Sequence, residues 1–216
     1  MTVKTHHRGF TLIELLVVIV IVAALATLAF MFSQRALLKG QKVTVMQQMR
    51  DVSTGMEAYS LDYKRPPVPQ SRLDTGTDTV YGNPEGEFGS EIIIGALLGE
   101  NDTYETGTDE IFSAREINPR ENQYIAVEIV DDNRGGVGAK DGKFYDLWGN
   151  EIMFAINTPA YREEDNDGRY DKILHTFGLG EWKDKKPRFE RYAMWSYGKD
   201  GEKGEFYSKS DDVAYF

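Results

Sequence analysis

The sequence predicts an α+β protein in which one long N-terminal α-helix packs on a small antiparallel β-sheet head. Two observations support this fold class. The chain opens with a long apolar stretch of helical character, and its second half holds a few short strand-like segments separated by Gly- and Asp-rich turns. With 216 residues, 41% of them hydrophobic, the chain is long enough for one folded domain with an appendage.

The first element is an uncharged run of 19 residues, Leu15–Ser33. As a helix it would be about 28 Å long, which matches the hydrocarbon thickness of a bilayer. Lys4 and Arg8 precede the run and favour a cytoplasmic N-terminus. Residues 10–33 are therefore predicted to span a membrane. Glu14 stands at the edge of the run, where an unpaired carboxylate is expensive, so it is a candidate functional residue.

The helix is predicted to continue to residue 65, giving one helix over 10–65. Apolar residues recur every three or four positions on one face, and Pro66 and Pro67 end the pattern. We expect this stripe to pack in a core beneath the head. Its members are Val45, Met49, Val52, Met56, Tyr59 and Tyr63.

The remaining residues, 66–216, form the predicted head. Residues 68–123 are rich in Gly, Thr, Asp, Glu and Asn and are mostly predicted to be a variable loop region. Within them, residues 90–99 suggest a short helix that Ser90 caps and Gly99 ends, although three consecutive isoleucines also permit a strand.

Residues 124–216 are predicted to hold the sheet and a C-terminal loop. The expected strands are separated by polar, glycine-containing segments, which favours antiparallel pairing. They are 124–130, 152–156, 192–197 and a short last strand at 205–207.

Composition excludes several functional classes. There is no cysteine, so disulfides, thiolate catalysis and cysteine-bound metals are excluded. A pI near 4.9 argues against nucleic acid as a partner. His175 is the only histidine after residue 7, and no nucleophile elbow, P-loop or dinucleotide fingerprint is present. We therefore expect no enzyme, although composition alone leaves a membrane-tethered glycosidase open.

Three interpretations of the N-terminus compete. A secretory signal peptide would be cleaved after Ala24-Leu25-Ala26, but Glu14 and the continued apolar run oppose it. A plain membrane anchor fits the length and leaves Glu14 unexplained. The third interpretation rests on residues 8–14, Arg-Gly-Phe-Thr-Leu-Ile-Glu, which resemble the processing site of type IV prepilins and pseudopilins.

This resemblance implies that a prepilin peptidase cuts between Gly9 and Phe10, removes the leader 1–9 and methylates Phe10. Glu14 then becomes the fifth residue of the mature chain, where its carboxylate would pair with the N-terminal amine of a neighbouring subunit and set the register of assembly. Many family members carry a proline at the position of Met31. Whether this helix melts between Met31 and Gly40 on assembly is therefore open.

Two segments of the head resemble the major pseudopilins of type II secretion systems. Residues 146–150, Asp-Leu-Trp-Gly-Asn, resemble their Asp-Pro-Trp-Gly-Asn turn, with Leu147 in place of proline. Residues 196–205 and 210–213 resemble their calcium loop. The resemblance implies calcium as a cofactor, with Asp200, Asp211 and Asp212 as ligands. Calcium prefers carboxylate and carbonyl oxygens in flexible loops, so the residue types agree.

A second acidic segment, 163–171, matches the first part of an EF-hand loop. Leu174 occupies the twelfth position, where such a loop needs a glutamate, so a surface loop is the favoured interpretation.

The chain thus resembles the type IV pilin-like family, most closely the major pseudopilin of type II secretion. The resemblance implies a helical homopolymer that drives protein export across the outer membrane. Implied partners are the prepilin peptidase, an assembly platform membrane protein, minor pseudopilins and the bacterial inner membrane, with the N-terminus cytoplasmic and the head periplasmic before assembly. The alternatives are a major or minor type IV pilin and, in a different class, a membrane-anchored calcium-binding adhesin.

Overall fold

The computed structural model describes residues 11–76, 78–105, 111–158, 182, 190–205 and 207–216. The chain divides into two compact units, Met1–Gly40 and Gln41–Phe216. Helix α1 (Leu12–Tyr63, 52 residues) supplies the described part of the first unit except Thr11, and it continues into the second. The helix ends two residues before the predicted limit, because Pro66 disfavours helical backbone at the residue before it.

The second unit is built on the part of α1 after Gly40. Five members of the predicted apolar stripe have no exposed surface, and Tyr63 is partly buried against the same core. The prediction of a core-facing stripe is thus confirmed. The five are Val45, Met49, Val52, Met56 and Tyr59.

A four-stranded antiparallel sheet packs against this part of α1. Its strand order is β1 (Thr79–Tyr81), β6 (Met153–Ile156), β7 (Tyr192–Ser196) and β8 (Val213–Tyr215). The central pair β6–β7 is in register from Met153 opposite Trp195 to Ile156 opposite Tyr192. The α+β class, with a long N-terminal helix packed on a small antiparallel sheet, is confirmed.

Alternate residues of β7 face two different clusters, as strand geometry requires. Tyr192 and Met194 join the main core with α1, whereas Ala193 and Trp195 join a second cluster on the other face of the sheet. The partly buried Trp182 and Tyr207 pack against that second cluster. Both faces of the sheet are therefore covered.

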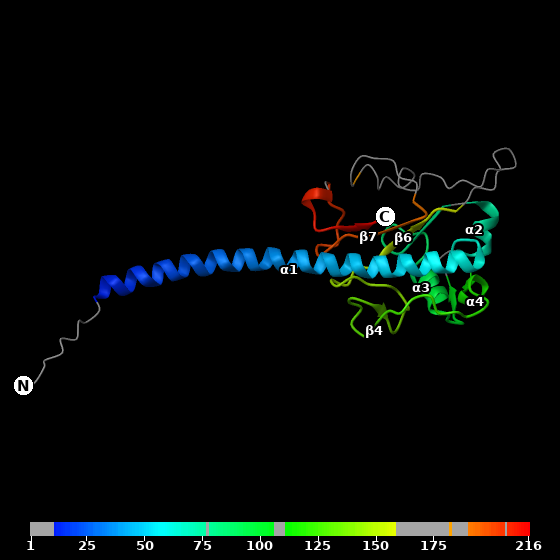
Figure 1. The fold of residues 1–216 in the computed structure, drawn as a ribbon, viewed down its shortest axis with the longest axis horizontal. Coiled ribbons are helices and arrows are strands. Elements are labelled where there is room, and N and C mark those ends of the chain that lie inside the picture. The colour runs from blue at the N-terminus through cyan, green and yellow to red at the C-terminus, as the bar shows by residue number, and fades with distance from the viewer. Residues whose placement is uncertain (1–10, 77, 106–110, 159–181, 183–189, 206) are drawn as a thin grey trace, which may run out of the picture. The chain divides into compact units, whose positions relative to one another are not determined.

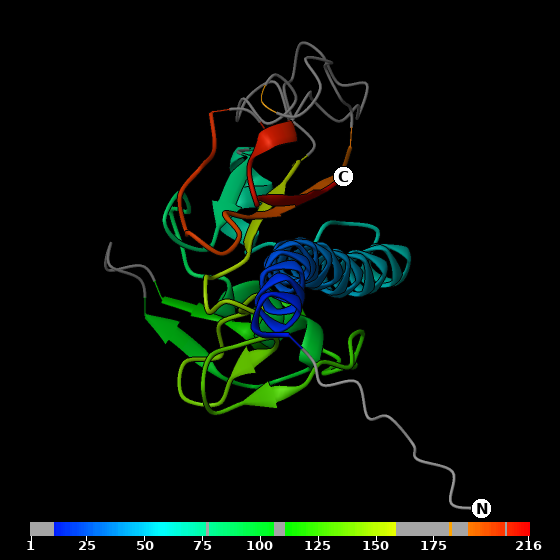
Figure 2. The same ribbon diagram turned by 90° about the vertical axis from the view of Figure 1, so that its left-hand side faces the viewer.

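In the second unit, elements lie on two opposite sides of α1. Strands β6 and β7 lie on one side, and α3 (Glu91–Leu98), α4 (Ala114–Ile117) and β4 (Ile129–Val130) lie on the other (Figure 1). The view along the helix shows the same division (Figure 2). Two small sheets belong to the second side, β2 (Thr103–Glu105) with β3 (Ile111–Ser113), and β4 (Ile129–Val130) with β5 (Val137–Gly138).

The predicted strand over 124–130 is wrong for most of its length, because only Ile129 and Val130 form a strand. The apolar residues before them pack on α1 instead. A methyl group built on Gly55 of α1 would lie 2.2 Å from the Ile125 side chain and 2.9 Å from the Tyr124 carbonyl oxygen. The missing side chain of Gly55 therefore provides the space in which this segment lies against the helix.

Other predictions for the head are corrected in detail. The last strand is β8, not 205–207, and Tyr207–Lys209 form a 3-10 turn. The short helix α3 is confirmed, and Gly99 ends it with φ 78°. Ser90 precedes α3, but its side chain makes no capping hydrogen bond. Region 68–123 is also more structured than predicted, since it holds β1, β2, β3, α4 and α2 (Gln70–Thr75).

Candidate functional site

The first candidate site is the start of α1. Gly9 and Phe10, the predicted processing residues, lie outside the described residues. Glu14 is described, and it forms a capping box with Thr11. The Glu14 Oε2 atom accepts hydrogen bonds from the Thr11 amide at 2.8 Å and the Thr11 hydroxyl at 2.7 Å, and the Glu14 amide donates to that hydroxyl at 3.2 Å. The pattern Thr-x-x-Glu before an apolar run is the sequence signal for this arrangement.

The apolar side chains that follow Glu14 in the first unit are exposed. Exposed fractions are 58% for Leu15, 54% for Ile21 and 68% for Phe32. By length and composition α1 is able to cross a membrane. An exposed apolar surface of this length requires a lipid or protein environment.

The second candidate site is the turn at 146–150. Asp146 is fully buried, and its Oδ1 atom accepts three backbone hydrogen bonds, from Trp148 at 2.8 Å, Gly149 at 2.8 Å and Asn150 at 2.9 Å. Gly149 has φ 98°, a conformation that glycine adopts without strain. The Trp148 ring packs at the edge of the main core.

This turn is hydrogen-bonded to the C-terminal loop. The Ser196 hydroxyl at the end of β7 donates to Asp146 Oδ2, and the Asn150 side-chain amide donates to the Gly198 carbonyl oxygen. Ser196 Oγ also accepts from the Gly198 amide at 3.1 Å. The two segments that resemble pseudopilin motifs therefore form one structural unit.

Helix α1 contacts the same unit at two positions. The Lys42 ammonium donates to the Ser210 carbonyl oxygen at 2.8 Å, and the Trp148 indole donates to Gln41 Oε1 at 3.3 Å. Both contacts lie in the second unit, directly after Gly40.

The three predicted metal ligands lie in this C-terminal loop. Asp211 Oδ2 accepts from the amides of Lys199 at 2.5 Å and Asp200 at 3.1 Å, so two of the three residues are in contact. Asp212 is 2% exposed, and its Oδ2 atom accepts from the Gly204 amide at 3.0 Å. Burial raises the pKa of the Asp212 carboxyl above its ordinary value, and the nearby charges of Asp211 and Asp200 raise it further.

Asp212 carries the observation that bears on calcium. Its Oδ1 atom is buried and has no hydrogen-bond partner among the described residues. A buried carboxylate oxygen without a partner is costly, and a cation would satisfy it. Within the described part of the chain, no three Asp, Glu, His or Cys side chains form a metal cluster by themselves. The side chains thus fit calcium only if backbone or solvent oxygens complete its shell.

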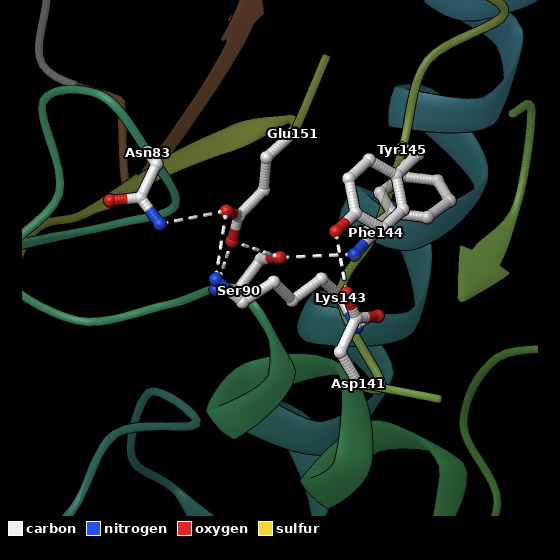
Figure 3. A network of polar contacts seen from close by, with 7 residues as sticks. All are labelled: Asn83, Ser90, Asp141, Lys143, Phe144, Tyr145 and Glu151. Carbon is white, nitrogen blue, oxygen red and sulfur yellow. Dashed lines mark hydrogen bonds and ion pairs between the residues drawn. The ribbon is translucent and has the colours of Figure 1, made fainter. Parts of the chain in front are cut away.

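A third polar cluster surrounds the buried Glu151, and no motif in the sequence indicated it (Figure 3). Its Oε1 atom accepts from the Ser90 amide and hydroxyl, each at 2.7 Å. Its Oε2 atom accepts from Asn83 Nδ2 at 3.0 Å and Lys143 Nζ at 3.3 Å. The Ser90 hydroxyl therefore donates to Glu151 and does not cap α3.

Glu91, the next residue after Ser90, is half-buried close to this cluster. Burial raises the pKa of its carboxyl, the Lys143 ammonium lowers it, and the Glu151 and Asp141 carboxylates raise it. Its Oε2 atom has no hydrogen-bond partner among the described residues. Glu91 is therefore a candidate for a pH-dependent contribution to stability.

Two sequence features lie outside the described residues. They are the acidic segment 163–171, interpreted as a surface loop, and His175.

Comparison with known proteins supports the class that the helix, the sheet and the N-terminus suggest. A family model described as the prokaryotic N-terminal methylation motif matches residues 4–30. The motif and the fold together support a pilin-like protein, a structural class that is generally not enzymatic.

One relative is a fimbrial protein. Fimbrial protein Q of Moraxella bovis is 27% identical over 132 residues, which is 61% of this chain and 82% of the relative. No solved structure matches the chain. The motif and the relative support a pilin-like filament subunit, and the N-terminal apolar helix fits a single-pass membrane anchor.

Proposed function

We propose that the chain is the major structural subunit of a type II secretion pseudopilus. The observation that carries this proposal is the connection of the 146–150 turn to the 196–212 loop through Asp146, Ser196 and Asn150. Both segments resemble those of major pseudopilins, and hydrogen bonds join them into one structural unit. The turn fixes the position at which the C-terminal loop leaves the sheet.

The assembly pathway follows from the N-terminal motif. The subunit enters the inner membrane with its N-terminus in the cytoplasm and its head in the periplasm. Prepilin peptidase removes residues 1–9 and methylates Phe10. A platform membrane protein, together with minor pseudopilins, then adds the subunit to a helical homopolymer. In the filament the exposed apolar residues of the first unit are buried against other subunits, which removes them from lipid.

Glu14 has two roles in this proposal. In the single subunit it caps α1 through Thr11. In the filament its carboxylate pairs with the amine of Phe10 from a neighbouring subunit and fixes the axial register. A paired charge in an apolar environment is much less costly than an isolated one, so only subunits in the correct register are stable.

Calcium is part of the proposal. Asp212 would bind it through the carboxylate oxygen that has no hydrogen-bond partner, and Asp200 and Asp211 lie beside it in the loop. When bound, calcium supplies a positive charge that holds the acidic C-terminal loop together, since the chain has no disulfide to do so.

A second candidate is a type IV pilin, because the relative named above is a fimbrial protein. Deleting the coding sequence separates the two. A pseudopilin mutant retains its secreted proteins in the periplasm and keeps its surface fibres, whereas a pilin mutant loses the fibres and secretes normally.

The test of the pathway itself is intact mass measurement and N-terminal sequencing of the membrane-extracted chain, with and without prepilin peptidase. A chain that begins at methylated Phe10 supports the proposal. A chain that begins at Met1 would make the protein a simple anchor, and one that begins at Thr27 a secreted protein. Either of the last two results contradicts the filament proposal.

A further inference from the structure

A groove of about 450 Å³ opens between the two small sheets of the second unit. One wall comes from β2 and the residues before it, and the other comes from β4, β5 and the turn after β5. Three carboxylates and one ammonium line the groove, together with the Ile129 side chain, which is 55% exposed. We call it the acidic groove. Its charged residues are Glu100, Asp102, Asp141 and Lys140.

The acidic groove has the chemistry of a site for basic side chains. Glu100 Oε2 accepts from the Tyr104 hydroxyl at 3.1 Å, and Asp141 Oδ2 accepts from the Tyr145 hydroxyl at 2.7 Å, so both carboxylates are held in position. Asp102 is exposed, and no described residue forms an ion pair with it. Burial raises the pKa of the Tyr104 hydroxyl, and the charges of Glu100 and Asp102 raise it further. Carboxylates beside an aromatic ring favour an ammonium or guanidinium group.

The chain itself contains one segment of the opposite charge. Residues 183–188, Lys-Asp-Lys-Lys-Pro-Arg, hold four basic residues and one acidic residue. No other six-residue window of the chain holds four Lys or Arg residues. We call residues 183–188 the basic segment. Residues 183–189 lie outside the described residues, but both of their flanks are described. In an acidic head, this segment is the best match to the groove by charge.

Both flanks of the basic segment are fixed on the sheet side of α1. The Trp182 indole donates to the Gly204 carbonyl oxygen at 2.8 Å, and its ring centroid lies 5.1 Å from that of Tyr207. At the other flank, the Arg191 carbonyl oxygen accepts from the Asn157 amide at 2.9 Å. The acidic groove lies on the opposite side of α1, where β4 lies (Figure 1).

The basic segment is too short to reach the groove of its own chain. Between the fixed residues Trp182 and Glu190, the chain extends at most about 3.4 Å per residue, so its midpoint reaches outward by roughly 14 Å. The sheet and α1 stand between the segment and the groove, and each is about 10 Å thick. The charge match is therefore available only between two copies of the chain.

We propose that the basic segment of one subunit docks in the acidic groove of a neighbouring copy. The contact rests on the proposed function, because it forms where copies of the chain assemble side by side. The basic side chains pair with the carboxylates of Glu100 and Asp102, and the Tyr104 ring lines the same groove. Such a contact joins two different patches, one on each side of α1. Repeated contacts of this heterologous kind generate open helical filaments when they do not close into a ring.

The experiment is disulfide cross-linking of the full-length chain in its native membranes, where introduced cysteines are the only ones. Asp102→Cys is combined in one chain with Lys183→Cys, Lys185→Cys or Lys186→Cys in turn. We expect at least one pair to give a ladder of dimers, trimers and longer oligomers, because each copy carries both halves of the contact. Each single variant should give no ladder. Glu116→Cys, at an exposed position of α4 outside the groove, should give none with Lys185→Cys.

Charge reversal tests the electrostatic part of the contact. Asp102→Lys should lower the yield of sheared filaments by roughly tenfold, because it places like charges opposite each other. Adding Lys185→Asp and Lys186→Asp to the same chain should restore the yield. Glu116→Lys is the matched control and should leave the yield unchanged. A loss that the second reversal does not rescue would count against the contact.

Processing of the N-terminus and filament yield, measured in the same membranes, separate this contact from the filament itself. Filaments that assemble from processed chains without a ladder in any of the three pairs overturn the docking contact and leave the proposed filament intact. A ladder without filaments supports the contact and contradicts the filament. A chain that still begins at Met1 and gives neither filaments nor a ladder overturns both.

Discussion

The carboxylate of Glu14 caps the start of α1, and in the proposed filament it also has a role in assembly. In the single subunit, both donors of Thr11 bind its Oε2 atom. No described residue donates a side-chain hydrogen bond to the other oxygen, Oε1. The capping box therefore holds the side chain at the helix start and leaves one oxygen for the pairing proposed with the amine of a neighbour.

We predict that Thr11→Val reduces filament formation without preventing cleavage by prepilin peptidase. Valine keeps the shape of threonine but removes the hydroxyl, and losing an N-cap costs about 0.5–2 kcal/mol. The measurement is the yield of sheared filaments relative to processed subunit in membranes. Thr27→Val is the matched control, because Thr27 only donates to the Ala23 carbonyl oxygen within α1. Equal filament yields for both variants would contradict the prediction.

A second prediction at this scale concerns Glu91. Burial raises the pKa of its carboxyl above the ordinary value of 4.5. An acid whose pKa is higher in the folded state binds its proton more tightly there. Stability therefore decreases as pH rises from the unfolded-state pKa to the folded-state pKa. We expect Glu91→Gln to raise the melting temperature near pH 7 and to have little effect near pH 4.

The measurement is thermal unfolding of the detergent-solubilised chain at both pH values. Glu116→Gln alters an exposed glutamate of α4 and serves as the control. The same change in melting temperature at pH 4 and pH 7 for Glu91→Gln would refute the pKa argument.

Among the elements, the 146–150 turn depends most on a single side chain. One oxygen of Asp146 accepts three backbone amides, and the other accepts from Ser196. Hydrogen bonds to a charged group contribute about 1.5–3 kcal/mol each. Without the Asp146 carboxylate, these donors would have no acceptor, so the contribution of their hydrogen bonds to stability would be lost.

We therefore predict that Asp146→Ala lowers the free energy of unfolding by roughly 3 kcal/mol or more. Three amides and the Ser196 hydroxyl would lose their acceptor in a buried place. Urea unfolding of the detergent-solubilised chain measures the change, with Asp132→Ala as an exposed control. A loss as small as that of the control would show that the turn holds its shape without the carboxylate.

The elements also show which parts of the fold were predictable. The periodic stripe of α1 is a local pattern over many turns, and it identified the buried residues correctly. Strand β1 has three residues and depends on β6 for pairing, so no local pattern marks it. Residues 124–128 have the composition of a strand, but Gly55 lets Ile125 pack on α1 instead.

The candidate sites also differ in whether the sequence could indicate them. The sequence indicated the turn, the C-terminal loop and Glu14 as candidates, because each is a short continuous motif. It missed the Glu151 cluster, whose members Asn83, Ser90, Lys143 and Glu151 come from distant positions. Only folding brings them together, and a lone glutamate in a chain with 35 acidic residues carries no signal.

At the scale of the whole molecule, the acidic charge of the chain opposes filament assembly. The net charge is −10, and residues 1–39 hold four basic residues and one acidic residue, so the head is more acidic than the total suggests. Like charges on neighbouring heads repel each other. A bound cation would reduce this repulsion as well as hold the C-terminal loop.

We predict that calcium raises the melting temperature of the chain and that magnesium does so less, because calcium accepts irregular oxygen shells. At a concentration about 100 times the dissociation constant, the stabilisation is about 2.7 kcal/mol, which corresponds to roughly 5 °C or more. Asp212→Ala should abolish the effect, whereas Asp132→Ala should keep it.

The effect should also weaken as pH falls, because burial raises the pKa of Asp212 and protons then compete with calcium for its carboxylate. A melting temperature that is the same in calcium and in chelator near pH 7 would contradict the calcium proposal and leave the filament proposal to be decided by the mass of the processed chain.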